Sequence, residues 1–414
     1  MTLLADLLST VFERRYRLSF GTGGDNRPVE DLAEALVGST AETSGLTLAA
    51  QILDRYAAMD DTEKLAFFRH LATAMNIDPV TVKATLDAYE AEPSKATYRA
   101  FVHAAEPKRH EFIKRLNHVP GATEALVRMR ADLLQLGAGE DALQALDLDF
   151  RHLFVSWFNR GFLVLRPINW ESPALILEKI IAYEAVHSID SWEDLRRRVE
   201  PSDRRCFAFF HPAMPDEPLI FVEVALTKDV PGSVQSLLTE DRQPISDQTA
   251  KTAVFYSISN CQPGLAGISF GNSLIKQVAA DLAFELPGLK TFVTLSPIPG
   301  LMGWAMQSEI EVDPSDALSV RQLAAHYLLE AKRGDGQPHD PVARFHLGNG
   351  AIIHAVHAEA DTSQKGMAQS AGAMVNYLYD LSRTAQNHED YASKRKIAAT
   401  NGVRTAASAF PTGA

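Results

Sequence analysis

The hydrophobic pattern of this 414-residue chain changes near residue 160. Before that point, apolar residues recur at spacings of three and four, which is typical of amphipathic helices. The stretch "DDTEKLAFFRHLATAMNI" carries one such stripe: Leu65, Phe68, Leu71 and Met75. Asp78 followed by Pro79 has the form of a helix N-cap with proline in the first turn. Short helices separated by turn residues predict a helical bundle over residues 1–160.

After residue 160, strand-like and helix-like segments alternate. "GFLVLRPI", "RRCFAFFH", "PLIFVEVALT", "TAVFYSISN" and "KTFVTLS" are rich in β-branched and aromatic residues, as strands are. "SPALILEKIIAYEAV" and "SLIKQVAADLAFEL" have helical spacing, and "ARFHLGNGAIIHAVH" favours a strand or turn followed by a strand. The alternation predicts a mixed α/β domain over residues 161–414, and the whole chain is therefore expected to be α+β.

Charge limits the partners of the chain. Its formal net charge is −12, which argues against nucleic acid or an anionic membrane as the main partner. An anionic ligand would have to be held by local dipoles and a few basic groups. The arginine runs at residues 196–198 and 204–205 are interpreted as a solvated face. The two cysteines, Cys206 and Cys261, exclude a disulfide-rich scaffold and favour a reducing compartment, although one disulfide is left open.

The start of the chain does not have the form of a secretory signal. Its first 20 residues include Asp6 and Glu13 and fit an amphipathic helix. No apolar run approaches the ~18 residues needed to span a bilayer. We therefore expect a cytoplasmic protein without nucleic-acid or membrane partners. The helical half shows no metal-ligand spacing or nucleophile arrangement, so we interpret it as an oligomerisation or scaffold domain.

A glycine-bearing loop precedes the predicted helix "SLIKQVAADLAFEL". Gly264, Gly267 and Gly271 let a backbone approach a ligand closely, and the free N–H groups of the helix's first turn suit a phosphate. The spacing fits neither a Walker loop nor the dinucleotide fingerprint. A glycine turn before a core helix is an equally good interpretation. That helix is expected to bury four residues on one side: Ile275, Val278, Leu282 and Leu286.

Ser296 lies in "TFVTLSPIPG", at the end of a buried strand and before two prolines. The motif is not the Gly-x-Ser-x-Gly elbow of one hydrolase class. Proline after Ser296 makes the backbone rigid, which would hold the hydroxyl in one place. The simpler alternative is a strand-ending hydroxyl that is bonded to nearby backbone.

His346 lies between Phe345 and Leu347 in "ARFHLGNGA". If the segment is extended, its imidazole points to the face opposite those two residues. Imidazole is the natural proton carrier near neutral pH. A hydrogen-bonded structural histidine beside a turn is the alternative, and the other histidines show no metal-ligand spacing.

These segments together resemble a known family. Strand, glycine loop, helix and strand form the core of the acetyltransferase-type (GNAT-like) acyl-CoA fold. More specifically, the chain resembles malonyl-CoA decarboxylases over residues 150–395. The matching stretches, in order, are "SWFNRGFLVLRPINWESPALILEKI", "EAVHSIDSWEDLRRRV", "EPLIFVEVALT", "FYSIS" with "GLAGISFGNSLIKQV", "LSPIPG", "DPVARFHLGNG" and "MVNYLYDL".

The resemblance implies roles for particular residues. Ser296 matches the family's catalytic serine and His346 its catalytic histidine. The segment "AGISFGN" matches the acyl-CoA-binding loop: Ala266, Gly267, Ile268, Ser269, Phe270, Gly271 and Asn272. The connection between Ser296 and His346 is shorter than in animal members, and their mitochondrial leader and peroxisomal tail have no counterpart. The resemblance is therefore to a compact bacterial form, and animal-type regulation and disulfide cross-linking are not implied.

The chemistry implied is decarboxylation of malonyl-CoA to acetyl-CoA and CO₂ without a metal or organic cofactor. Ser296 is expected to contact the departing carboxylate or accept its proton, and His346, as imidazolium, to protonate the enolate carbon. The roles are interchangeable on this argument, or Ser296 orients His346. An acyl-CoA-dependent N-acyltransferase and a non-catalytic acyl-CoA sensor are the alternatives. The resemblance also implies self-association as a dimer or tetramer.

Overall fold

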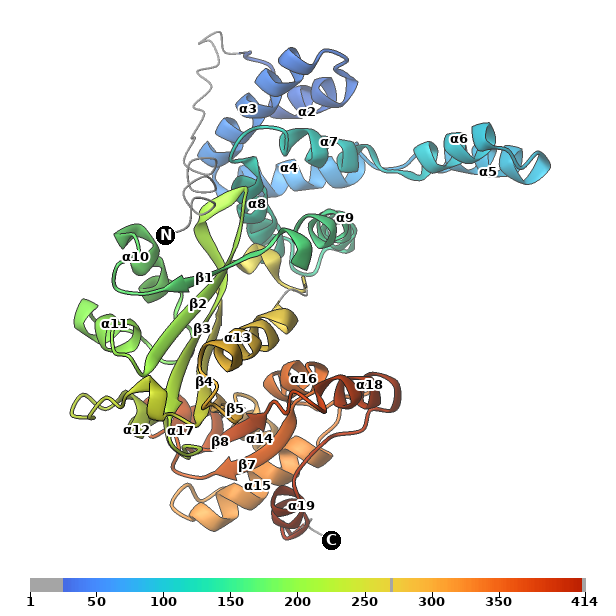
Figure 1. Ribbon diagram of the computed structural model, residues 1–414. Helices are drawn as coiled ribbons and strands as arrows, with labels where there is room; N and C mark the ends of the chain where they lie inside the picture. The colour runs from blue at the N-terminus through green and yellow to red at the C-terminus, as the bar shows by residue number, and fades with distance from the viewer. Residues whose placement is uncertain (1–24, 269–270, 412–414) are drawn as a thin grey trace. The chain divides into compact units, whose positions relative to one another are not determined.

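A computed structural model describes residues 25–268 and 271–411, and contacts divide the chain into two compact units (Figure 1). Unit 1 comprises the described part of Met1–Val164, Phe210–Glu217 and Gln262–Ser269. Unit 2 comprises Leu165–Phe209, Pro218–Cys261 and the described part of Phe270–Ala414. The amphipathic helix expected over the first 20 residues lies outside the described residues.

Unit 1 is mainly helical, as expected. Its described helices are α2 (Val29–Gly38), α3 (Glu42–Ala58), α4 (Asp61–Thr73), α5 (Pro79–Ala91), α6 (Lys95–Ala105), α7 (Lys108–Leu116), α8 (Ala122–Leu136), α9 (Asp141–Trp157) and the short 3₁₀ helix η1 (Arg160–Phe162). Three residues of the predicted stripe are buried and Leu65 is half-buried. Asp78 caps α5 by accepting hydrogen bonds from the N–H groups of Val80 and Thr81.

The described residues contain one eight-stranded sheet, ordered β1-β2-β3-β4-β5-β8-β6, with β7 also paired to β8. The strands are β1 (Val164–Ile168), β2 (Arg204–His211), β3 (Met214–Thr227), β4 (Thr252–Asn260), β5 (Thr291–Thr294), β6 (Ser296–Pro297), β7 (Ile352–His357) and β8 (Met374–Leu378). The helices of unit 2 are α10 (Ala174–Tyr183), α11 (Trp192–Val199), α12 (Val234–Leu238), α13 (Gly271–Glu285), α14 (Leu301–Gln307), α15 (Ala317–Glu330), α16 (Pro341–Gly348), α17 (Gln364–Ser370), α18 (Thr384–Lys394) and α19 (Asn401–Ser408), with the 3₁₀ turn η2 (Asp247–Thr249). The 3₁₀ turn η3 (Pro263–Leu265) belongs to unit 1. The expected α+β class, a helical half followed by a mixed α/β half, is confirmed.

The centre of the sheet opens between β4 and β5. These strands run parallel and pair from Thr252 with Thr291 to Phe255 with Thr294. The Leu295 N–H then donates to the Phe255 carbonyl at 3.0 Å, after which the chain leaves β4 to pair with β8. Strand β4 continues to Asn260 without pairing with β5. The order β4, glycine loop, α13, β5 is the core that the sequence predicted, and all four residues expected on the buried side of α13 are buried.

One prediction of secondary structure is wrong, and it concerns His346. Residues 343–348 were expected to be extended or in a turn, but Pro341–Gly348 form helix α16. Asp340 caps this helix and Pro341 occupies its first turn, so Asp340 and Pro341 repeat the pattern seen at Asp78 and Pro79. The strand predicted after it is confirmed as β7.

The two arginine runs are also not uniformly solvated. Arg198 and Arg204 are each only 4% exposed. Arg198 lies three residues after the buried Leu195 on α11, which turns it inward, where it pairs with Asp194 and Glu223. Arg196, by contrast, is exposed, so helical position rather than composition decides which arginine is solvated.

Three further expectations bear on partners. Cys206 and Cys261 are both buried and neither is in a disulfide, so the disulfide left open by the sequence is not formed. Among the described residues, none of the helices has the length and apolar character needed to cross a bilayer. The same residues include no group of three or more His, Cys, Asp or Glu side chains arranged to hold a metal ion.

Candidate active site

Ser296 lies where the chain leaves β5 and joins β8. It pairs with Val375 in the antiparallel β6–β8 ladder, and the next residue, Pro297, pairs with Met374. Its side chain is only 5% exposed. Because proline fixes its own φ and has no N–H, the backbone next to the Ser296 hydroxyl has little freedom. Ser296 therefore follows the end of β5, as expected, but it begins a further short strand, β6.

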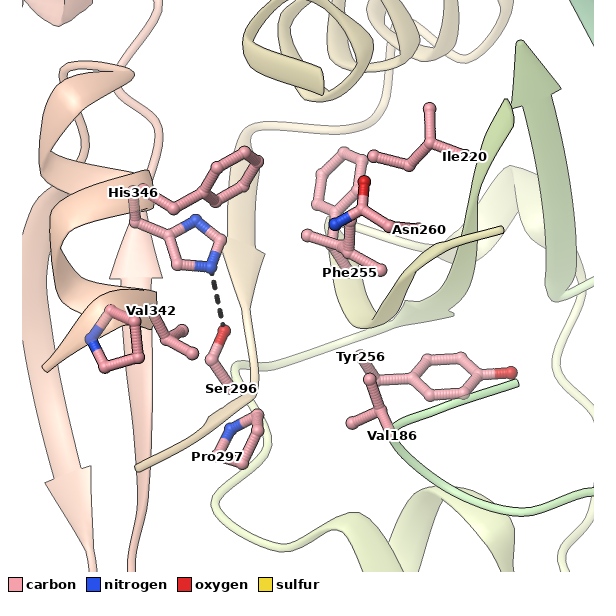
Figure 2. A pocket seen from close by; sticks show the side chains of 12 residues that line it. Val186, Ile220, Phe255, Tyr256, Asn260, Ser296, Pro297, Val342 and His346 are labelled. Atoms are coloured by element: carbon pink, nitrogen blue, oxygen red, sulfur yellow. Dashed lines mark hydrogen bonds between the residues drawn. The ribbon is translucent and has the colours of Figure 1, made fainter. Parts of the chain in front are cut away.

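His346 is brought to Ser296 by the last turn of α16. The side chain of Asp340 accepts a hydrogen bond from the Ala343 N–H at 2.7 Å and so fixes the start of this short helix. His346 is 2% exposed, and its Nε2 atom lies 3.2 Å from the Ser296 Oγ atom. Figure 2 shows this contact as a dashed line. The two residues, 50 positions apart, form the pair that the sequence predicted.

Tyr377 of β8 and Tyr379, which directly follows this strand, both contact the imidazole. The hydroxyl of Tyr379 lies 2.8 Å from His346 Nδ1. The ring of Tyr377 stacks on the imidazole, with 4.4 Å between centroids and 23° between planes. Residues two apart on a strand share a face, which is why both tyrosines reach the same histidine. The stacked Tyr377 ring thus limits tilting of the imidazole, and the Tyr379 hydroxyl limits its rotation.

Thr294 completes a chain of hydrogen bonds. The Ser296 hydroxyl donates to Thr294 Oγ1 at 2.8 Å, and the Tyr377 N–H donates to the same oxygen at 3.1 Å. With the Ser296 hydrogen directed to Thr294, the consistent tautomer of His346 carries its hydrogen on Nε2 and accepts from Tyr379 at Nδ1. The hydrogen bonds then run from Tyr379 through His346 and Ser296 to Thr294, which is the final acceptor.

Burial sets the charge of the histidine. It lowers the pKa of His346 from 6.5 to about 3, because an imidazolium is poorly solvated inside the protein. In the ligand-free protein the ring is therefore neutral near pH 7, whereas the imidazolium was expected for the reaction with bound substrate. Burial also raises the pKa of the Tyr379 hydroxyl well above its ordinary value, so this group stays protonated.

Ser296 and His346 both line a cavity of about 250 Å³ within unit 2. In Figure 2 they lie across this space from Phe255 and Asn260 of β4, while the Tyr256 hydroxyl points away from them. Most of the other lining side chains are apolar: Val186, Ile220, Phe255, Ile258, Val342 and Phe345. The described lining residues include no lysine, arginine, aspartate or glutamate. A carboxylate that enters would find the Ser296 hydroxyl, the His346 imidazole and the Asn260 amide among its polar partners.

Two family-level sequence models match most of the chain. The malonyl-CoA decarboxylase C-terminal domain matches residues 161–322 and 314–411, and the malonyl-CoA decarboxylase N-terminal domain matches residues 75–158. The chain belongs to the malonyl-CoA decarboxylase family. The recognition made from the sequence is therefore confirmed.

Individual members of the family are similar over most of their length. A solved structure of a malonyl-CoA decarboxylase from Rhodopseudomonas palustris is 48% identical, with a TM-score of 0.86 over 91% of this chain and 98% of that one. One from Agrobacterium vitis is 47% identical, with a TM-score of 0.86 over 92% and 99%. The mitochondrial malonyl-CoA decarboxylase of Anser anser anser is 34% identical over 360 residues, which is 73% of this chain and 70% of that protein.

The glycine loop, for which acyl-CoA binding was expected, is described up to Ile268. The Ile268 N–H donates to the Leu265 carbonyl at 3.0 Å, and Gly267 has a φ of +75°. Ser269 and Phe270 lie outside the described residues. Gly271 and Asn272 begin α13. Ser296 and His346 belong to unit 2, whereas Gln262–Ser269 belong to unit 1.

The sequence reasoning missed Thr294, Tyr377 and Tyr379. All three lie inside stretches that carry the family resemblance or adjoin it, namely "TFVTLSPIPG" and "MVNYLYDL". A signal was present, since two tyrosines two residues apart in a buried strand must share a face. The missing information was which strand pairs with Ser296, and that is a tertiary fact.

Proposed function

We infer that this chain catalyses the decarboxylation of malonyl-CoA to acetyl-CoA and CO₂, and we propose that Ser296 and His346 carry the chemistry. The supporting observation is their 3.2 Å contact at the wall of a largely apolar cavity, in a chain of this family. A hydroxyl and an imidazole at hydrogen-bonding distance can contact a carboxylate and move a proton.

The reaction has a simple balance. The bond between the carboxylate carbon and the α-carbon breaks, and its electron pair moves onto the thioester oxygen to give an enolate. The α-carbon then takes one proton, so that malonyl-CoA and H⁺ become acetyl-CoA and CO₂. Because the thioester accepts the electron pair, we propose that no metal or organic cofactor takes part.

The cavity favours this reaction electrostatically. A carboxylate that leaves water for a mainly apolar cavity loses solvation, whereas the transition state spreads its charge toward the thioester and releases neutral CO₂. Ser296 is the proposed contact of the carboxylate. Its fixed position would help to turn the carboxylate out of the thioester plane, the geometry in which the breaking bond overlaps the carbonyl π system.

His346 is the proposed proton donor. It is neutral in the free protein, but a bound carboxylate nearby raises the pKa of an imidazole, since opposite charges stabilise each other. The carboxylate of the substrate therefore favours protonation of His346, the group that is proposed to donate the proton to the α-carbon. The imidazolium then gives its proton to the α-carbon and returns to the neutral form. Binding of an unreactive, negatively charged malonyl-CoA analogue should accordingly take up close to one proton, which calorimetry in buffers of different ionisation enthalpy can measure.

Incubation with malonyl-CoA alone, followed by chromatography, tests the activity. Decarboxylation yields acetyl-CoA and CO₂, whereas the two alternatives give different results. An N-acyltransferase needs an acceptor amine and yields free CoA, and a sensor binds without turnover. Absence of acetyl-CoA from a folded protein that binds CoA would overturn the proposed activity.

We also propose self-association through the helical half and a cytoplasmic location. Helices α5 and α6 bury none of their described residues, and four of their large apolar side chains are exposed: Val80, Leu86, Tyr98 and Val102. Apolar residues gathered on one helical pair suit a contact between protein copies. Light scattering coupled to size-exclusion chromatography tests this proposal, and a purely monomeric mass would contradict it.

A further inference from the structure

The glycine loop at residues 262–268 packs closely against α8 within unit 1. A Cβ atom at Gly264 would lie 1.8 Å from the backbone oxygen of Val127 on that helix. No side chain fits at this distance, so the close approach requires glycine. The first glycine of the loop thus allows close packing on α8, and this packing rather than a ligand accounts for the glycine.

Arg130, one turn after Val127 on α8, holds the same loop by its backbone. Its Nη1 group donates to the Gly264 carbonyl at 2.7 Å and to the Ala266 carbonyl at 2.9 Å. Arg130 is only 2% exposed, and Asp147 of α9 balances its charge through an ion pair of 2.7 Å. A buried guanidinium needs such partners, and all of them are fixed protein groups.

This arrangement orients the next peptide group. Because a trans peptide is planar, holding the Ala266 carbonyl toward Arg130 turns the Gly267 N–H the opposite way. An exposed cation lies nearby: Arg151 Nε on α9 is 3.9 Å from the place that a Gly267 Cβ atom would occupy. A backbone donor and a guanidinium in one small region are groups that bind phosphate.

We propose that Arg130 is a positioning residue for the acyl-CoA-binding loop. It fixes the loop backbone in the conformation that receives the anionic part of CoA, and so the helical half contributes to substrate affinity. This rests on the function proposed above and on the proposal that residues 266–268, described residues of the loop, lie at the CoA phosphates. Arg130 touches no reacting atom, and its removal therefore weakens binding rather than chemistry.

The helical half contains a matched control. Arg109 is 4% exposed, and it pairs with Asp149, two residues after Asp147 on the same helix. Its Nη1 group donates to a backbone carbonyl, that of Ala72, at 3.0 Å. Arg109 thus makes the same kinds of contact as Arg130 but has none with the glycine loop.

The experiment compares Arg130→Gln with Arg109→Gln in the full chain. Calorimetric titration gives the Kd of CoA, steady-state assays with malonyl-CoA give KM and kcat, and thermal unfolding gives Tm. Arg130→Gln is expected to raise Kd and KM by about 10-fold or more, with kcat little changed, because two charge-assisted hydrogen bonds to the loop are lost. Arg109→Gln is expected to lower Tm without changing Kd. Arg130→Lys, which keeps the charge, is expected to restore part of the affinity.

Gly264→Ala changes the contact from the loop side and leaves Arg130 intact, so it serves if Arg130→Gln does not fold. It is expected to raise the Kd of CoA as well. Unchanged Kd in a folded Arg130→Gln or Gly264→Ala protein would overturn the proposal, as would equal changes in Kd for the Arg109 and Arg130 variants. A wild type that binds CoA but yields no acetyl-CoA would contradict only the proposed reaction, since Kd still tests the loop.

Discussion

The Ser296–His346 pair and the Arg130–Asp147 pair are both buried polar sites, but they are built in opposite ways. The first is neutral, is held by hydrogen bonds of hydroxyl and imidazole groups, and opens into a cavity. The second is an ion pair whose hydrogen bonds go to backbone and carboxylate groups of its own unit. A neutral site can change its charge when substrate arrives, whereas a compensated ion pair holds one geometry. Mutations of the Ser296–His346 pair should therefore change kcat, whereas mutations of the Arg130–Asp147 pair should change substrate affinity.

The largest effect should come from the neutral pair. Ser296→Ala and His346→Gln are each expected to lower kcat by about 10²- to 10⁴-fold, the range for loss of a proton donor or a fixed charge-stabilising group. The Kd of CoA should stay close to that of wild type, because neither residue is part of the glycine loop. Release of labelled CO₂ gives kcat, and calorimetry gives Kd. Near-normal kcat in both variants would contradict the assignment of the chemical step to Ser296 and His346.

Tyr379→Phe should have the next largest effect. It leaves His346 Nδ1 buried without its 2.8 Å partner and frees the imidazole to turn. An unsatisfied buried group costs about 1–3 kcal/mol, so kcat should fall by about 10-fold or more. Tyr377→Phe is the matched variant, because it keeps the ring stacked on His346 and removes a hydroxyl that has no hydrogen-bond partner among the described residues. A loss as large in Tyr377→Phe would show that packing, rather than the Nδ1 contact, matters.

The contrast between the two sites also shows what could be predicted from the sequence. The helical half, the order of strand, glycine loop, helix and strand, and the residues Ser296 and His346 all followed from periodicity or from ordered motifs. These signals are local, or are carried by short stretches that the family shares. The helix that carries His346 was missed, although Asp340 and Pro341 have the pattern correctly interpreted at Asp78 and Pro79.

Other features could not be obtained from local pattern. Tyr379 reaches His346 because β6 pairs with β8, and these strands are about 80 residues apart in the chain. Arg130 contacts Gly264 across 134 positions. In the sequence of an amphipathic helix, an arginine that is buried against a carboxylate from elsewhere in the chain cannot be told apart from a solvated arginine. The same reason explains why Arg198 was wrongly placed on a solvated face.

The neutral state of His346 should appear in the pH dependence of stability. Its folded pKa, about 3, lies below its ordinary value of 6.5, so between these values the unfolded chain binds more protons than the native protein. The contribution to stability is complete above pH 6.5 and is lost as the pH falls toward 3. From neutral pH to pH 5, wild type should lose on the order of 2 kcal/mol more unfolding free energy than His346→Gln. Urea titrations of both proteins measure this, and parallel pH profiles would contradict a neutral buried ring.

Asp340 should give a pH dependence of the opposite sign. Burial raises the pKa of this carboxyl from 3.8 to about 6, so between these values the native protein binds more protons than the unfolded chain. Stability from this group is therefore lost as the pH rises through that window. Asp340→Asn keeps an oxygen that can accept from the Ala343 N–H and removes the titration, so its stability relative to wild type should grow between pH 4 and pH 6 and be constant above.

Asp340→Ala separates the charge from the cap. It also ends the titration, but it leaves the first turn of α16 without its 2.7 Å acceptor. It should therefore be less stable than Asp340→Asn by about 1 kcal/mol at every pH, the usual value of an N-cap. Because α16 carries His346, kcat should fall in the alanine variant and be largely kept in the asparagine variant. Equal kcat in the two variants would show that Ser296 and the β8 tyrosines hold the imidazole without help from the helix cap.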